Sequence, residues 1–173
     1  IVVFVLNGVA FGNVQALSEI VFIDPSVPQA EMIVAQLPEN AEVVRLSPGM
    51  EAIAQISARL AKKVNLSTIR IISHGNEGYF VLNGTRIDND FLQEQGSRVA
   101  PWGRALAENG DILLYACNLA ATNEGKAFVG KLSDLTGADI AASIDITGGE
   151  IFKGNWSLEY EIGQIDTIAL TIE

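Results

Sequence analysis

Residues 68–75 read TIRIISHG, and this stretch carries the clearest strand signal in the chain. Its first six residues are mostly apolar and β-branched, which is typical of a buried β-strand. The run ends at Ser73 and is followed by His74, the single histidine of the chain, and by Gly75. Mostly apolar runs of similar length occur at residues 19–24, 42–46, 111–116 and 138–143. We predict that these runs form the strands of one sheet.

Helical patterns separate most of these strands, at residues 28–37, after Ser47 and Pro48, at 90–109 and at 122–137. The second pattern places apolar residues on one stripe at helical spacing: Met50, Ile53, Ile56, Leu60 and Val64. The third is predicted to break around Gly96 and Pro101 and to end at Gly110. Apolar strands that alternate with helices favour parallel pairing through right-handed crossovers. The predicted architecture is a three-layer α/β/α sandwich with a mostly parallel sheet and added β-hairpins.

Asn-Gly pairs, which suit tight hairpin turns, occur at residues 7–8 and 83–84. The second pair predicts a hairpin over residues 78–88. The first pair makes residues 1–18 an N-terminal hairpin or extension, although this stretch also fits the end of a signal peptide. Residues 19–173 then form one domain. Near its end, short strands are predicted at residues 150–154, 156–162 and 167–172.

Composition limits the classes of function that fit this chain. With 173 residues, 49% of them hydrophobic, it is long enough to bury one core. A net charge of −10 repels phosphate backbones and anionic lipid, so we predict neither a nucleic-acid nor a membrane partner. The single cysteine excludes an internal disulfide, and one histidine with one cysteine is a poor zinc ligand set. We therefore predict a monomer without a metal or another cofactor.

The only cysteine, Cys117, follows the strand at 111–116 just as His74 follows the strand at 68–73. Carboxyl ends of parallel strands meet at one edge of a sheet, and consecutive strands are usually neighbours. A histidine beside a cysteine accepts the thiol proton and makes the sulfur nucleophilic. Backbone N–H groups at Gly75 and Cys117 would then form an oxyanion hole. The alternative is structural, with Cys117 as a small buried apolar residue and His74 as a hydrogen-bonded surface residue.

The pair of motifs IISHG and LLYACN resembles the caspase-like superfamily of cysteine peptidases, in which one strand ends in His-Gly and another in Ala-Cys. More closely, the run from EIVFIDPSVP to GNWSLE, about residues 19 to 160, resembles an uncharacterised bacterial domain family. That family typically occurs near the amino end of very long, repeat-rich secreted or surface proteins. The resemblance implies a caspase-like sheet, a His74–Cys117 dyad and a peptide or protein substrate. It also implies export to the cell surface or beyond, with the chain's own polypeptide as one possible substrate.

Departures from the caspase pattern argue against cleavage after aspartate. Tyr115 stands where caspases have glutamine, and no arginine is placed to bind an aspartate side chain. In this superfamily the specificity pocket draws on the loops after the first strand and after the strand that follows the cysteine strand. Those loops contain Asp24 and Asp145, which predicts a basic residue before the cut unless both are ordinary turn formers. Two functions stay open: a cysteine endopeptidase, or an inert caspase-like binding or capping module.

Overall fold

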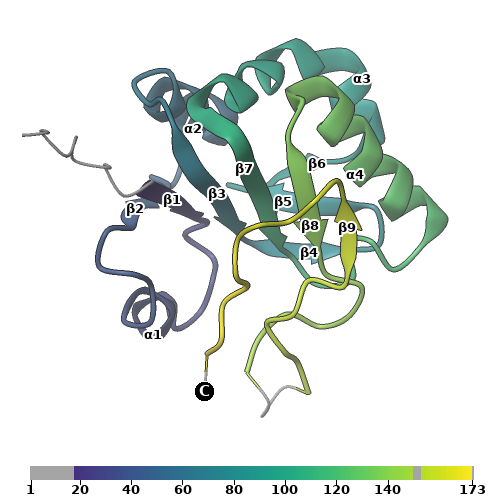
Figure 1. Ribbon diagram of the computed structural model, residues 1–173. Coiled ribbons are helices and arrows are strands. Elements are labelled where there is room, and N and C mark those ends of the chain that lie inside the picture. Colours follow the sequence, from purple (N-terminus) through teal and green to yellow (C-terminus); the bar gives the residue numbers. More distant parts are fainter. Residues whose placement is uncertain (1–17, 150–152, 173) are drawn as a thin grey trace, which may run out of the picture.

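The computed structural model describes residues 18–149 and 153–172, which form a six-stranded main sheet and a three-stranded second sheet (Figure 1). The main sheet has the order β2-β1-β3-β7-β8-β9, and all neighbours are parallel except β8 and β9. Its strands are β1 (Ser18–Ile23), β2 (Glu42–Arg45), β3 (Leu66–Ile72), β7 (Leu106–Tyr115), β8 (Asp139–Ala142) and β9 (Tyr160–Ile162). The α/β class and the mostly parallel sheet are confirmed.

The second sheet is a meander of short antiparallel strands that begins directly after β3. It consists of β4 (His74–Asn76), β5 (Tyr79–Leu82) and β6 (Thr85–Ile87). Asn83 and Gly84 connect β5 to β6 with φ angles of 48° and 77°, the left-handed conformation that a tight hairpin turn requires. The predicted hairpin at 78–88 is therefore confirmed. The hairpin predicted around residues 7–8 lies outside the described residues.

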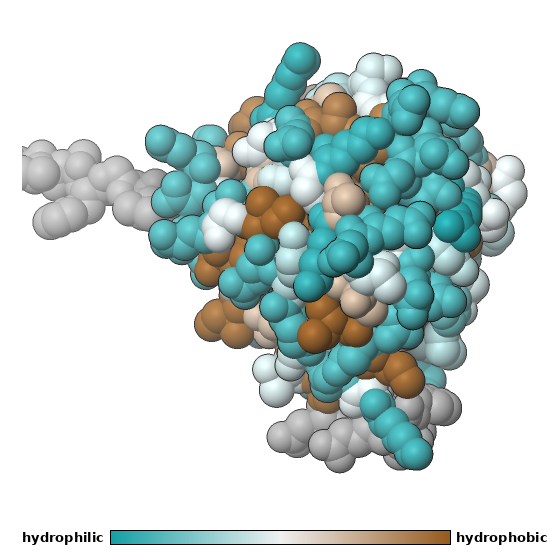
Figure 2. Space-filling view, turned by 90° about the vertical axis from the view of Figure 1, so that its right-hand side faces the viewer, coloured by the Kyte–Doolittle hydropathy of each residue, from teal (hydrophilic) through white to brown (hydrophobic). Residues whose placement is uncertain are grey.

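One face of the main sheet is covered by α2 (Ala52–Leu60), α3 (Asn89–Gln95) and α4 (Asn123–Thr136), with short 3-10 turns at 96–98 and 100–105. The side chains between these helices and the sheet are apolar and fully buried, and Phe80 and Phe128 meet edge to face in their midst. Figure 2 shows the side of the molecule on which α4 lies, and its surface is mostly hydrophilic. This is the amphipathic arrangement expected of helices that cover a sheet.

The opposite face carries a thinner layer, made of the short helix α1 (Ala30–Val34) and the extended C-terminal segment at 164–172. Figure 1 shows this yellow segment crossing in front of the sheet. Its backbone is held by side chains of the strands: Asp111 Oδ2 accepts the Thr167 N–H at 2.8 Å, and Arg70 donates to the Ile168 carbonyl at 3.0 Å. The predicted strand at 167–172 is wrong, because the segment binds strand side chains where a strand would bind a neighbouring backbone.

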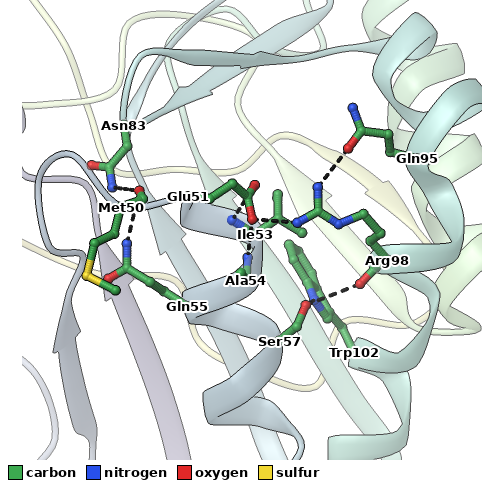
Figure 3. A network of polar contacts seen from close by, with 10 residues as sticks. All are labelled: Met50, Glu51, Ile53, Ala54, Gln55, Ser57, Asn83, Gln95, Arg98 and Trp102. Atoms are coloured by element: carbon green, nitrogen blue, oxygen red, sulfur yellow. Dashed lines mark hydrogen bonds and ion pairs between the residues drawn. The ribbon is translucent and has the colours of Figure 1, made fainter.

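The start of α2 differs from the prediction that Ser47 and Pro48 begin the helix. Glu51 is the N-cap, and its carboxylate accepts the backbone N–H groups of Ile53 and Ala54 at 3.2 and 2.7 Å. Figure 3 shows that Glu51 also pairs with Arg98 and that the Asn83 side chain donates to the Met50 carbonyl. Ile53, Ile56 and Leu60 are buried as predicted, whereas Met50 and Val64 are exposed because they lie outside the helix.

The segment at 90–109 is only partly helical. Helix α3 ends at Gln95, and β7 already begins at Leu106, so the prediction that Gly110 ends a helix is wrong. Gly110 lies inside the strand, where an added Cβ would come within 2.8 Å of the Leu66 carbonyl oxygen. A glycine is therefore needed here, because β7 lies too close to β3 to leave room for a side chain. Of the strand predicted at 156–162, only Tyr160–Ile162 pairs with the sheet.

Candidate active site

His74 and Cys117 lie at the same edge of the sheet because β3 and β7 are neighbours. Ile72 is paired with Tyr115, and the Ser73 N–H donates to the Tyr115 carbonyl at 3.1 Å. Side chains alternate along a strand, and those of Ile72 and Tyr115 face the α1 side of the sheet. His74 and Cys117 follow two residues after Ile72 and Tyr115, beyond the ends of β3 and β7. Both line one cavity of about 280 Å³ on that side.

Cys117 occupies the first position of a turn that connects β7 to α4. Asn118 adopts a left-handed φ of 55°, and its N–H donates to the Asp145 carbonyl at 2.6 Å. The thiol is partly buried and lies 3.6 Å from the Thr147 carbonyl oxygen, to which it donates. The loop after β8 therefore fixes the position of the sulfur at the cavity.

His74 is exposed, and one ring nitrogen is held by backbone. Its Nε2 lies 3.2 Å from the carbonyl oxygen of Ser26 in the loop after β1. Because a carbonyl oxygen only accepts hydrogen bonds, Nε2 carries the hydrogen of this contact. In the neutral imidazole the lone pair then lies on Nδ1, which is the nitrogen that can accept a proton. The Ser26 contact therefore favours the tautomer with its hydrogen on Nε2.

Asp24 holds the loop that carries this carbonyl. Its side chain is 2% exposed, and Oδ1 accepts both the N–H of Ser26, at 2.9 Å, and its hydroxyl. Oδ2 accepts the N–H of Asn83 at 2.6 Å. Asp24 does not line the cavity of His74 and Cys117 but a separate hollow beside Pro48 and Gly84. Both carboxylate oxygens are therefore occupied within the protein.

Asp145, the second carboxylate predicted to bind substrate, is exposed and lines neither of these two cavities. Its Oδ2 accepts a hydrogen bond from the Asn155 side chain at 2.8 Å, and its Oδ1 one from the Ser143 hydroxyl at 3.3 Å. The structure does not bring Asp24 and Asp145 together in one pocket. Both residues brace loops around the site.

Gly75 touches the cysteine strand directly. A Cβ at this position would lie 2.7 Å from the Ala116 Cβ and 3.1 Å from the Tyr79 carbonyl oxygen, closer than side chains pack. A glycine is therefore needed for the two strand ends to meet. The same contact brings the backbone of Gly75 alongside the residue that precedes Cys117.

The cavity wall is mostly apolar and comes from segments that are distant in sequence. Its apolar side chains come from the loop after β1, from α1, from β3 and from the C-terminal part of the chain: Val27, Met32, Ile33, Ile72, Trp156 and Ile172. Trp156 packs against Tyr115, with ring centroids 5.9 Å apart. Burial raises the pKa of Tyr115, although hydrogen bonds from Arg70 and the Leu170 N–H oppose the shift. The phenol beside the cavity is therefore neutral.

Comparison with known proteins identifies the family. The family described as "Domain of unknown function (DUF4347)" matches residues 20–173. The chain belongs to this family. No curated protein sequence matches this DUF4347 chain significantly. A solved structure titled "Crystal structure of a small-chain dehydrogenase" has 11% sequence identity and a TM-score of 0.41, and the match covers 70% of this chain and 78% of that one.

The described part of this DUF4347 domain has neither a cluster of metal-ligating side chains nor a membrane-spanning helix. Within residues 18–149 and 153–172, no three His, Cys, Asp or Glu side chains are grouped so that they could hold a metal ion. Among the same residues, no helix is both long and apolar enough to cross a membrane.

The sequence did not predict that the Ser26 carbonyl would bind His74 or that Trp156 would line the cavity. A backbone carbonyl has no residue signature, because any residue supplies one. Trp156 carried a weak signal as one of two tryptophans in the chain, but a tryptophan is more often a packing residue. Asp24-Pro25-Ser26 did carry a turn signal, which indicates the loop but not the side chain it would orient.

Proposed function

We propose that this domain is a cysteine endopeptidase in which Cys117 is the nucleophile and His74 the general base. One observation carries the proposal: the Ser26 carbonyl binds Nε2 of His74, and His74 shares a cavity with the chain's only cysteine. The Ser26 contact uses Nε2 and leaves Nδ1 as the nitrogen that can accept a proton, as a general base must. The caspase-like arrangement of the two motifs is part of the same proposal.

The proposed reaction is acyl transfer through a thioester. The Cys117 sulfur attacks the carbonyl carbon of a peptide bond while its proton passes to Nδ1 of His74. The proton is then given to the departing amine as the C–N bond breaks. A water molecule attacks the thioester, His74 accepts a proton from it, and this proton returns to the sulfur as the acid product leaves. Water is the only co-reactant.

Backbone N–H groups of Gly75 and Cys117 are proposed to stabilise the negative charge on the carbonyl oxygen. The close packing of Gly75 on Ala116 supports this assignment, since it keeps the two strand ends together. Donors held by a rigid backbone need no reorganisation when charge develops, and one such donor is typically worth about 10²–10³ in rate.

The substrate and location are also proposals. A peptide or protein substrate follows from the chemistry of the dyad, and the resemblance to modules of long surface proteins makes the chain's own polypeptide a candidate. The same resemblance supports export and a monomeric enzyme without cofactor. The acidic net charge of −10 is consistent with a partner that is neither nucleic acid nor anionic lipid.

Incubation of the domain with a proteome-derived peptide library tests the proposal. Mass spectrometry should find new peptide ends with the wild type and none with Cys117→Ala. His74→Ala should reduce cleavage by roughly 10²-fold or more, because the nucleophile then lacks its base. Both variants should keep the wild-type melting temperature, since neither residue is in the buried core. Equal cleavage by wild type and Cys117→Ala would show that another group, or a contaminant, is responsible.

A second function, an inert binding or capping module, is favoured by one contact. The Cys117 thiol is partly buried and already donates to Thr147, as a structural cysteine would. In that case the library would stay uncleaved, and Cys117→Ala and His74→Ala would leave every binding property unchanged.

A further inference from the structure

The cavity beside Cys117 and His74 has walls that suit a particular kind of substrate. We propose that it accepts a large apolar side chain of the substrate, on the residue before the scissile bond. This assignment rests on the proposed peptidase function and specifies which kind of substrate side chain the enzyme prefers. The cavity that Cys117 lines also has apolar wall residues, among them Ile72, Trp156 and Ile33.

The size of the cavity fits one side chain. A volume of about 280 Å³ is slightly below the roughly 300–1,000 Å³ of pockets that hold whole small-molecule ligands. It equals the space of about nine water molecules, given about 30 Å³ for each. This space is large enough for a leucine or phenylalanine side chain.

Charge is missing from the cavity wall. Among the lining residues that the structure describes, none is Asp, Glu, Lys or Arg, and His74 is the only titratable base. Asp24 and Asp145 are bound to other groups outside the cavity. A lysine or arginine side chain would therefore be desolvated without a counter-charge, which is unfavourable. An aspartate would meet the same difficulty.

The polar atom of Tyr115 is also occupied. Its hydroxyl oxygen accepts hydrogen bonds from Arg70 and from the Leu170 N–H, both at 2.9 Å. The phenol therefore contributes its ring to the cavity, next to the indole of Trp156. At the rim, Met32 is an apolar side chain that is 50% exposed although it lines the cavity. Apolar surface thus continues from the wall to the entrance.

Peptidyl acyloxymethyl ketones that differ only in the residue next to the reactive group test this specificity. Four probes, with Leu, Phe, Arg or Asp at that position, are compared by the second-order rate of Cys117 labelling, followed by intact mass. Burial of a Leu or Phe side chain should make these two probes about ten- to a hundredfold faster than the Arg and Asp probes. Iodoacetamide, which has no side chain to bind, reports the reactivity of the thiol itself.

A charge placed at the rim should change the preference. Met32→Glu puts a carboxylate at the cavity entrance and should raise the Arg-to-Leu ratio of labelling rates at least tenfold, and the iodoacetamide rate of the same variant reports any change in the reactivity of the thiol itself. Met50→Glu is the matched control, because Met50 is 58% exposed and lies outside the cavity. It should leave the ratio as in the wild type. Melting temperatures of both variants verify that they fold.

The outcomes separate this assignment from the proposed function. If Arg or Asp probes label Cys117 fastest, the apolar assignment is overturned while the peptidase remains supported. If no peptidyl probe labels faster than iodoacetamide, the peptidase and the pocket assignment are both overturned. Faster labelling by Leu and Phe, lost selectively in Met32→Glu and kept in Met50→Glu, supports both.

Discussion

The two faces of the main sheet differ in the kinds of side chain that they bury. The face under α2, α3 and α4 buries an apolar cluster of side chains between helices and strands. The face under α1 and the C-terminal segment, here called the polar face, buries a smaller apolar cluster, but it also holds the buried side chains of Thr68, Arg70 and Asp111 and the cavity of Cys117. The difference indicates a division of roles: apolar packing on the helical face supplies stability, and the polar face positions a segment and a site.

Arg70 is the centre of the polar face. It is 3% exposed, pairs with Glu19 at 2.6 Å and donates to the Tyr115 hydroxyl and the Ile168 carbonyl. A helix has its backbone groups paired internally, whereas an extended segment needs partners from outside. The strand side chains supply those partners, which explains why polar residues are buried on this face.

The largest effect is expected on the helical face, from Phe128→Ala. Phe128 is fully buried against Phe80, and its removal leaves a cavity that the helices cannot close. We expect a loss of about 3–5 kcal/mol in the free energy of unfolding, measured by urea titration. Met32→Ala, a half-exposed side chain on the other face, should lose about 0.5 kcal/mol or less. Similar losses for the two variants would contradict the division between the faces.

Arg70→Met tests the polar face itself. The substitution leaves the Glu19 carboxylate without its partner, so we expect a loss of about 3 kcal/mol, the lower end for a broken buried pair. The double variant Arg70→Met, Glu19→Gln should lose less than Arg70→Met alone, because no charge then stays unpaired. A loss below about 1 kcal/mol for the single variant would mean that the pair behaves like a surface ion pair.

Tyr115→Phe should have a smaller effect than Arg70→Met, about 1–2 kcal/mol, because Arg70 and the Leu170 N–H lose one acceptor. Burial raises the pKa of Tyr115 above the ordinary value of 10. The neutral phenol therefore stabilises the fold below pH 10, and this contribution is lost as the pH rises through the folded pKa. The stability of Tyr115→Phe should lack this alkaline decrease.

Hydrogen exchange gives the control for Tyr115→Phe. Exchange should become faster around Leu170 and stay unchanged in α4, which lies on the other face. Uniformly faster exchange would show that the hydroxyl supports the whole fold and not the C-terminal segment.

The sequence allowed the central strands to be predicted because their apolar runs are long and bounded by turns. The proximity of His74 and Cys117 followed from one rule, the adjacency of consecutive parallel strands. The start of β7 was missed because residues 106–110 contain Glu108, Asn109 and Gly110, which do not favour strands.

The roles of the acidic residues could be predicted only in part, because each binds a serine two residues away, as a turn former does, but also an asparagine farther along the chain. Asp24 is bound by Asn83, and Asp145 by Asn155, and neither pairing has a local pattern. A carboxylate near a predicted site looks the same in sequence whether it faces a substrate or holds a loop. The segment at 167–172 was misassigned for a related reason, since its alternating pattern matches a strand while its partners are side chains.

The central claim is that His74 serves as the base for Cys117. Its most direct test is the rate of Cys117 alkylation by iodoacetamide at pH 7 in the wild type and in His74→Gln. Glutamine retains an N–H for the Ser26 carbonyl but has no basic nitrogen, so the loop is preserved while the base is removed. The account predicts a rate at least tenfold lower in His74→Gln, with an unchanged melting temperature. Equal rates in the two folded proteins would contradict it.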